Sequence, residues 1–224
     1  HMAVVGIDLG TTNSLVGVWQ DGESRIIPNS LGELLTPSVV SVDDRGMVLV
    51  GRAAKDRLVS HPEQTASQFK RLMGSNEKII LGRRTFSPEE LSALVLKQLK
   101  ADAESDLGDP VEEAIISVPA YFNNNQRTAT LHAAQLAGLN VERLINEPTA
   151  AALAYGVQEA EDERNFIVVD LGGGTLDETI LEKFDDLLEV HATSGDSFLG
   201  GEDFTFAMVG AVCAKLQMDR QALT

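Results

Sequence analysis

Two copies of one short pattern constrain this chain more than any other feature of its sequence. Residues 5–10 and 168–172 both read as an apolar strand that runs into Asp-Leu-Gly, and each copy leads into glycine and threonine. The copies stand too far apart for a repeat with a period of about 20–50 residues, as in solenoids and propellers. They fit two related lobes that present the same kind of turn to a shared cleft.

A turn of this composition is suited to binding phosphate. Glycine lets the backbone approach a ligand closely, and successive N–H groups in a tight turn form an anion-binding concavity. The aspartate before each turn, Asp8 or Asp170, is placed to bind Mg²⁺, which uses one or two carboxylates together with substrate phosphates. One turn alone would also suit an ordinary hairpin. The pair predicts a site that clamps a polyphosphate from both sides.

Two better-known phosphate motifs do not fit the sequence. No segment matches G-x-x-x-x-G-K-[ST], which excludes a Walker-type loop. The triple glycine at 172–174 does not complete G-x-G-x-x-G, because Asp177 stands where the third glycine should be. The phosphate chemistry is therefore expected from the two Asp-Leu-Gly turns alone.

Charge and cysteine content narrow the classes of function. The 224 residues include 18 Lys and Arg against 34 Asp and Glu, a formal net charge of −16. This acidity argues against nucleic acid and anionic membranes as partners, since both need a basic surface. The single cysteine, Cys213, excludes an intramolecular disulfide framework and a multi-cysteine zinc site. We expect a reduced, cytoplasmic protein with no nucleic-acid or membrane partner.

The local signals predict a mixture of strands and helices. Hairpins are expected within residues 4–19, 39–50 and 180–192, and single strands at 114–118 and 167–169. Helices are expected at 52–59, 62–74, 87–107, 149–155 and about 203–216, and from Asn124 or Asn125 to about 137. Residues 159–164 read as a solvated, charged connector. Because hairpins interrupt the strand–helix alternation, the predicted class is mixed α/β.

Five segments, taken together, resemble a known family, the DnaK-type chaperones or seventy-kilodalton heat-shock proteins. Residues 6–14 resemble the first phosphate motif of that family, and residues 170–175 resemble the second. Residues 118–122 are similar to its interlobe segment, 146–152 to its first connecting motif, and 200–204 to the segment after the second phosphate motif. The stretch 69–76 is most similar to the HscC branch. Five motifs in order over nearly the whole chain make the resemblance specific.

The resemblance implies an actin-like ATPase fold of the ribonuclease H-like class, with mixed sheets, flanking helices and two lobes. The first lobe is expected at residues 3–157, with an inserted subdomain at about 37–112, and the second lobe at 158–224. The later adenosine motif, the remainder of the second lobe and the peptide-binding domain have no counterpart in the sequence. We therefore expect a fragment with an incomplete second lobe, whose ATPase activity in isolation is weak or absent.

The resemblance also implies a role for each site residue. Lys70 is expected to position the attacking water at the γ-phosphate of ATP. The other residues of the catalytic set are Glu147, Thr175 and Asp170. The residues implied to bind ATP or ADP are Gly10, Thr11, Thr12, Asn13, Lys70, Gly172, Gly173, Gly174, Thr175, Gly200, Gly201 and Glu202. Those implied to hold Mg²⁺ are Asp8, Asp170, Glu147 and Asp177, while Pro119 and Arg127 would form a switch that reports the bound nucleotide.

The implied function is ATP binding and hydrolysis that drive a chaperone. Its implied partners are unfolded peptide clients, a J-domain co-chaperone and a nucleotide-exchange factor. Two alternatives stay open: a sugar kinase of the same actin-like clan, which would need a further substrate-binding aspartate, and a nucleotide-regulated filament protein. Taken without the motifs, Lys70 reads as a surface lysine and Glu147 as a carboxylate that favours a helix N-terminus.

Overall fold

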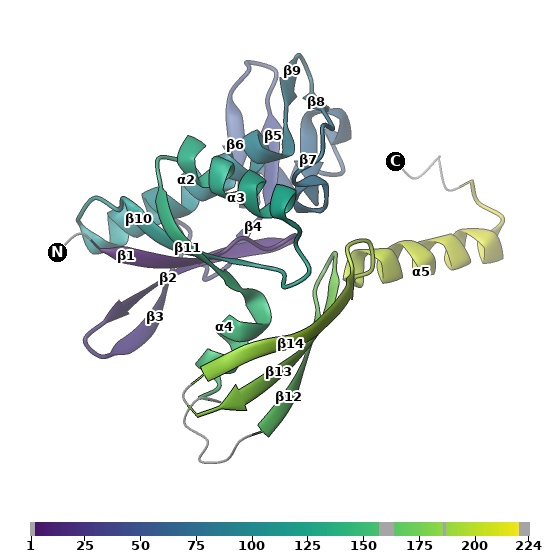
Figure 1. Ribbon diagram of the computed structural model, residues 1–224. Helices are drawn as coiled ribbons and strands as arrows, with labels where there is room; N and C mark the ends of the chain where they lie inside the picture. Colours follow the sequence, from purple (N-terminus) through teal and green to yellow (C-terminus); the bar gives the residue numbers. More distant parts are fainter. Residues whose placement is uncertain (1–2, 157–163, 186, 220–224) are drawn as a thin grey trace.

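The first lobe is built on a six-stranded mixed sheet (Figure 1). The computed structural model describes residues 3–156, 164–185 and 187–219. The strand order is β11-β10-β1-β2-β3, and the short β4 pairs with β2. The strands are β1 (Val4–Asp8), β2 (Asn13–Gln20), β3 (Glu23–Ile27), β4 (Thr36–Pro37), β10 (Glu113–Val118) and β11 (Asn140–Asn146). The predicted mixed α/β class is confirmed.

Three parallel strands bring chemically important residues to one edge of this sheet. β1 pairs in parallel with β10, and β10 in parallel with β11. Their carboxyl ends therefore point the same way: Asp8 ends β1, Ser117 lies beside Asp8 on β10, and Asn146 ends β11. Glu147 follows directly as the first residue of α4 (Glu147–Ala154). Ligands in α/β sheets bind outside this carboxyl edge.

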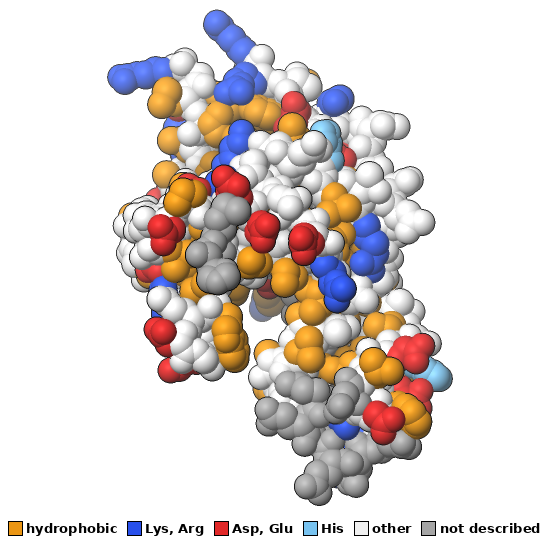
Figure 2. All heavy atoms as spheres, turned by 60° about the vertical axis from the view of Figure 1, so that its left-hand side comes forward, with side chains coloured by type: hydrophobic (Ala, Val, Ile, Leu, Met, Phe, Trp, Pro, Cys, Tyr) orange, Lys and Arg blue, Asp and Glu red, His pale blue; other side chains and the backbone are white. Residues whose placement is uncertain are grey.

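One face of the sheet forms the core of the protein. The β1 side chains alternate, with Val5 and Ile7 buried and their neighbours exposed. They pack with Leu91, Leu96 and other apolar residues of α2 (Pro88–Leu107) and α3 (Asn124–Leu136), the two helices on that side. On the opposite face, an apolar hollow of about 580 Å³ exposes Trp19 of β2. Figure 2 shows further hydrophobic side chains at the molecular surface.

A small subdomain inserted between β4 and α2 forms the upper part of Figure 1. Its three-stranded sheet has the order β6-β5-β7, and β8 pairs with β9 as a separate hairpin. The elements are β5 (Val39–Val42), β6 (Val48–Val50), α1 (Arg52–Lys55), β7 (Thr65–Ser67), β8 (Ile79–Leu81) and β9 (Arg84–Phe86). Two 3₁₀ turns complete it, η1 (Pro62–Gln64) and η2 (Phe69–Leu72). η2 carries the predicted catalytic Lys70.

The second lobe contains an antiparallel sheet of β12 (Arg164–Leu171), β13 (Leu176–Phe184) and β14 (Leu187–Asp196), followed by α5 (Gly201–Leu216). α4 lies between this sheet and the main sheet (Figure 1). In the described part of the lobe, only Leu181 and Cys213 are buried apolar side chains. Its core is therefore much smaller than that of the first lobe. None of the described helices has the length and apolar character to span a lipid bilayer.

Several local predictions are wrong in an instructive way. The helix expected at 62–74 is two 3₁₀ turns around β7, because β7 pairs with β5 and Gln68 adopts a left-handed conformation that no α-helix contains. The helix expected at 52–59 ends at Lys55. The strands β3, β8, β9 and β11 were not predicted. The predicted lobe boundary at 157 and most of the connector at 159–164 lie outside the described residues.

The start of α3 offers a direct test of the fold. Asn123, rather than Asn124 or Asn125, caps this helix: its Oδ1 accepts from the Gln126 N–H at 3.0 Å, and Gln126 Oε1 accepts from the Asn123 N–H at 3.0 Å. We expect Asn123→Ala to lower the free energy of unfolding in urea by about 1 kcal/mol. Asn124→Ala is the matched control and should change it by less than about 0.5 kcal/mol. Equal losses in both variants would contradict this capping assignment.

Candidate functional site

A cleft of about 210 Å³ lies between the two Asp-Leu-Gly turns. It opens at the carboxyl edge of the main sheet, with the second turn on the opposite wall. All the residues that line it belong to the set implied by the sequence: Asp8, Gly10, Thr11, Thr12, Asn13, Lys70, Glu147, Asp170, Gly172, Gly173 and Thr175. The fold therefore brings together one cluster from residues that span most of the chain.

The first turn is held from behind by serine side chains. Ser38 Oγ donates to the Gly10 carbonyl at 2.8 Å and lies 2.8 Å from Ser14 Oγ, while the Ser38 N–H donates to the Thr12 carbonyl at 2.9 Å. Both serines are buried. Gly10 has no room for a side chain, since a Cβ would lie 2.0 Å from the Asn13 carbonyl oxygen. With its carbonyls tied on one side, the turn has a fixed backbone path along the cleft.

The second turn is held by its own backbone and by the start of α5. The Gly172 N–H donates to the Thr175 carbonyl at 2.9 Å. The N–H groups of Gly201 and Glu202 donate to the carbonyls of Gly172 and Gly173 at 3.0 and 2.8 Å. Gly200 and Gly201 therefore lie behind the turn and outside the cleft lining, and Glu202 lines a smaller neighbouring pocket. For these three residues the structure gives a supporting position, and direct nucleotide contact stays a prediction.

The two turns touch each other at one end of the cleft. A Cβ on Gly173 would lie 2.0 Å from Thr12 Oγ1, and a Cβ on Gly174 would lie 2.4 Å from Thr11 Cγ2. Contacts this close leave glycine as the only residue that fits without movement. Thr12 Oγ1 is buried and has no hydrogen-bond partner in the described part of the protein. An orphan hydroxyl beside a glycine cradle fits a phosphate oxygen as its partner.

Lys70 and Glu147 form a buried ion pair in the cleft. Lys70 Nζ donates to Glu147 Oε1 at 2.8 Å and lies 5.8 Å from the centroid of the Phe122 ring. Burial acts to lower the pKa of Lys70, but the negative charges of Glu147 and Asp8 outweigh it and raise that pKa. Burial raises the pKa of Glu147, against the opposing effect of Lys70. Lys70 is therefore a fixed cation between the two phosphate-type turns.

Asp8 and Asp170 face this cation from opposite lobes. Ser117 Oγ donates to Asp8 Oδ1 at 3.2 Å and orients that carboxylate. Partial desolvation in the cleft, followed by the negative charge of Asp8, raises the pKa of Asp170. No group of three or more metal-type ligands occurs among the described residues. The arrangement fits Mg²⁺ held by one or two carboxylates with the remaining ligands from phosphate and water.

Asp177 does not line the cleft. It is buried, its Oδ2 accepts from the Ala120 N–H at 2.9 Å, and its Oδ1 accepts from Thr179 Oγ1 at 3.0 Å. The carboxylate links the second lobe to the segment after Pro119 of the first lobe. Its predicted contact with the metal water shell is untested, and its observed role is to join the lobes.

The predicted switch residue Arg127 contacts the same segment after Pro119. Its guanidinium donates to the Phe122 and Ala120 carbonyls at 3.0 and 3.2 Å and to Asn146 Oδ1 at 2.8 Å. Arg127 therefore connects α3 both to the segment after Pro119 and to the residue before Glu147. A signalling role for Pro119 and Arg127 stays a prediction.

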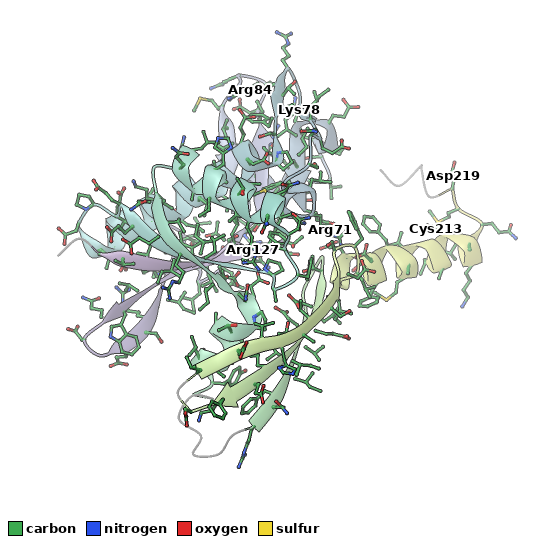
Figure 3. The ribbon with its side chains drawn as sticks, in the orientation of Figure 1. Arg71, Lys78, Arg84, Arg127, Cys213 and Asp219 are labelled. Carbon is green, nitrogen blue, oxygen red and sulfur yellow. The ribbon has the colours of Figure 1, made fainter. Side chains whose placement is uncertain are left out.

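Sequence reasoning missed the groups that support the cleft, above all Ser38, Ser117 and Arg71. The Arg71 guanidinium contacts the second turn from the first lobe (Figure 3). Each of these side chains acts through partners far away along the chain. Only the position of Arg71 next to Lys70 could have drawn attention to it, because cations are few in so acidic a sequence.

The raised pKa of Asp170 predicts a pH-dependent stability. A carboxyl whose pKa is raised by folding favours the native state below its unfolded pKa of about 4, and this stabilisation is lost as the pH rises through the folded pKa. We therefore expect Asp170→Asn to raise the thermal midpoint by roughly 1–2 °C at pH 7 without divalent metal. The gain should vanish below about pH 4, where the parent aspartate is protonated.

Calorimetric scans from about pH 3.5 to about pH 8 span this transition and measure the difference. Asp185→Asn, in the turn directly after β13 of the second lobe, is the control for a general effect of removing one negative charge. A stabilisation by Asp170→Asn that does not change with pH, or one matched by Asp185→Asn, would contradict the assignment.

Comparison with known protein families accounts for this cleft. The family model described as Hsp70 protein matches residues 4–80 and 76–222, nearly the whole chain. The match includes both turns, Lys70 and the helix that begins at Glu147. Membership of this family implies a chaperone nucleotide-binding domain with the actin-like ATPase fold. That fold agrees with the mixed sheets and flanking helices observed. The chain belongs to the Hsp70 family.

Proposed function

We propose that this chain forms part of the ATP-hydrolysing domain of a DnaK-type chaperone that works in the cytoplasm. The observation that carries the proposal is the buried Lys70 ammonium group, fixed 2.8 Å from Glu147 between two turns of phosphate-binding composition. A cation held between two such turns is suited to a polyphosphate that enters between them. The HscC branch is the proposed position within the family, on the compact stretch at residues 69–76.

In this proposal the backbone of both turns binds the phosphates of ATP. The N–H groups of residues 10–13 and 173–175 and the hydroxyls of Thr11, Thr12 and Thr175 act as donors. When bound, Mg²⁺ supplies positive charge to the phosphate oxygens, and Asp8, Asp170 and Glu147 are the carboxylates that would hold it. In phosphoryl transfer the protein mainly positions groups and stabilises charge, which matches a site built from fixed donors.

Lys70 acts on the water that attacks the γ-phosphate. Its ammonium group has three donors, and the ion pair with Glu147 uses one of them. The remaining donors can orient a water molecule and stabilise the charge that develops on the phosphate oxygens. Glu147 keeps the lysine charged and in place, because a buried ammonium without a carboxylate would tend to lose its proton.

ATP turnover would control the binding of unfolded peptides. A J-domain co-chaperone would accelerate hydrolysis, and an exchange factor would release ADP. The decisive test is ATP turnover by the full-length gene product with and without an unfolded peptide and a J-domain protein. Stimulation by both supports the proposal. Phosphate transfer to a sugar, or ATP-dependent light scattering that rises steeply with concentration, would instead favour the kinase or the filament protein.

Replacing Lys70 tests the catalytic assignment. We expect Lys70→Ala in the full-length protein to slow single-turnover hydrolysis by about 10²–10³-fold, the typical cost of losing one transition-state donor, while ATP still binds. Lys78→Ala is the control, since Lys78 is exposed on the inserted subdomain and lines neither the cleft nor the small pocket beside it. Rates of Lys70→Ala within a few-fold of the parent would exclude the proposed role.

The lining of the cleft predicts how nucleotide binds to the 224-residue chain. Glycine, threonine, asparagine and charged residues make up that lining, with no aromatic or aliphatic side chain from the described residues to pack on a base. We expect inorganic tripolyphosphate with Mg²⁺ to bind as tightly as MgATP, and both only weakly. Isothermal titration calorimetry compares the two. A preference for ATP of more than about tenfold (about 1.4 kcal/mol), or micromolar affinity, would show a base-binding surface that this prediction excludes.

A further inference from the structure

Arg71 of the 3₁₀ turn η2 reaches across to the second lobe. Its neighbour Lys70 lines the cleft. The Arg71 side chain lies outside that lining and bonds the second turn near the start of α5 (Figure 3). The Arg71 side chain is 9% exposed. A buried arginine requires partners for its donors, and the guanidinium finds them in the second lobe, at Gly174 and Asp203.

The contacts of Arg71 fasten two parts of the second lobe at once. Arg71 Nε donates to the Gly174 carbonyl at 2.8 Å, and its Nη2 donates to Asp203 Oδ2 at 2.6 Å. The guanidinium carbon lies 5.6 Å from the centroid of the Phe198 ring, within the range of a cation–π contact. One planar group therefore joins the phosphate turn to the beginning of α5.

Asp203 extends this connection into the backbone. It stands in the first turn of α5, where its Oδ2 also accepts from the Gly200 N–H at 2.8 Å. The next two N–H groups, those of Gly201 and Glu202, donate to the carbonyls of Gly172 and Gly173. With the Arg71 bond to Gly174, three successive carbonyls of the turn are held on the side away from the cleft. The phosphate turn is thus fixed from behind along its whole glycine run.

We propose that Arg71 is a positioning residue that locks the second phosphate turn onto the first lobe. It sets the distance between the two walls of the cleft and keeps the glycine N–H groups available to phosphate. The consequence for ATP rests on the function proposed above, whereas the mechanical role rests only on the contacts. Lys70 and Arg71 thus have complementary roles, since Lys70 supplies charge inside the site and Arg71 holds the opposite wall in place.

The chemistry of arginine suits this role. The guanidinium presents donors in a rigid fork, so one group can bond a carbonyl and a carboxylate in fixed geometry. A lysine could keep the attraction to Asp203, but its single ammonium group cannot reproduce the fork. There is also little space at this contact, because a Cβ on Gly174 would lie 2.9 Å from Arg71 Nε. The turn and the guanidinium are therefore in direct contact, and movement of one displaces the other.

Amide hydrogen exchange on the full-length protein, without nucleotide, tests the mechanical role. We expect Arg71→Met to speed exchange about tenfold in residues 171–176 and 199–203, the loss expected for hydrogen bonds to charged groups, and to leave residues 9–14 unchanged. Arg71→Lys should recover only part of the protection. Asp203→Asn removes the ion pair from the other lobe and should give the same local pattern.

ATP kinetics then test the consequence for the site. We expect the KM for ATP to rise about tenfold in Arg71→Met, with a smaller rise in Arg71→Lys, because the phosphate turn is no longer held in its binding position. Arg52→Met, which breaks the exposed Arg52–Glu33 ion pair of 2.9 Å, is the matched control and should keep parental exchange and KM.

The outcomes separate this inference from the proposed function. Parental exchange in both Arg71→Met and Asp203→Asn would overturn the lock, even in an active chaperone. Faster exchange throughout the first lobe of Arg71→Met, together with parental exchange in Asp203→Asn, would overturn it as well. Faster local exchange in a protein that shows no ATP turnover would support the lock and contradict the ATPase function.

Discussion

The close contact between the two Asp-Leu-Gly turns determines which kind of ligand the cleft can bind. Gly173 and Gly174 approach Thr12 and Thr11 so closely that a Cβ at either glycine would overlap the threonine. Where the two turns meet, the glycine backbone of the second turn therefore packs against the threonine side chains of the first. The donors left free there are N–H and O–H groups. Such a surface suits an anion and offers little to an apolar ligand. The serines, Arg71 and the start of α5 serve to hold these two turns at this distance.

The chain as a whole is acidic, yet it can hold a site for a polyanion because positive charge is concentrated beside the two turns. A formal net charge of −16 excludes broad basic surfaces, yet Lys70 and Arg71 place two cations beside the turns. Each is buried and each has a carboxylate partner, Glu147 or Asp203. Each pairing offsets the cost of burying the cation, since a buried cation without a partner would be strongly disfavoured. The acidic remainder of the protein repels polyanions, so that the cleft is the place where they can bind.

Features of the fold and the site could be predicted where a short stretch of sequence determines them. They could not be predicted where they depend on residues far apart in the chain. The turns were identified because their residue types carry the chemistry themselves, whereas Lys70 and Glu147 were identified only through the resemblance to the DnaK-type family. The structure lines the cleft with all of them. The carboxylate partner of Arg71 lies 132 residues away, and no local pattern reports such a pair. The helix expected at 62–74 failed for the same reason, because pairing of β7 with β5 outweighed the local signals. The choice of Asn123 among three adjacent asparagines depended on Gln126.

The position of the second lobe depends on polar contacts more than on a hydrophobic core. Within its described residues only Leu181 and Cys213 are buried apolar side chains, whereas the first lobe has a continuous core. The links to the first lobe include Arg71 with Gly174 and Asp203, and Asp177 with the Ala120 N–H. Such contacts are directional and individually modest in free energy. A ligand that adds bonds to both turns would therefore make a substantial addition to the contacts that hold the second lobe on the first.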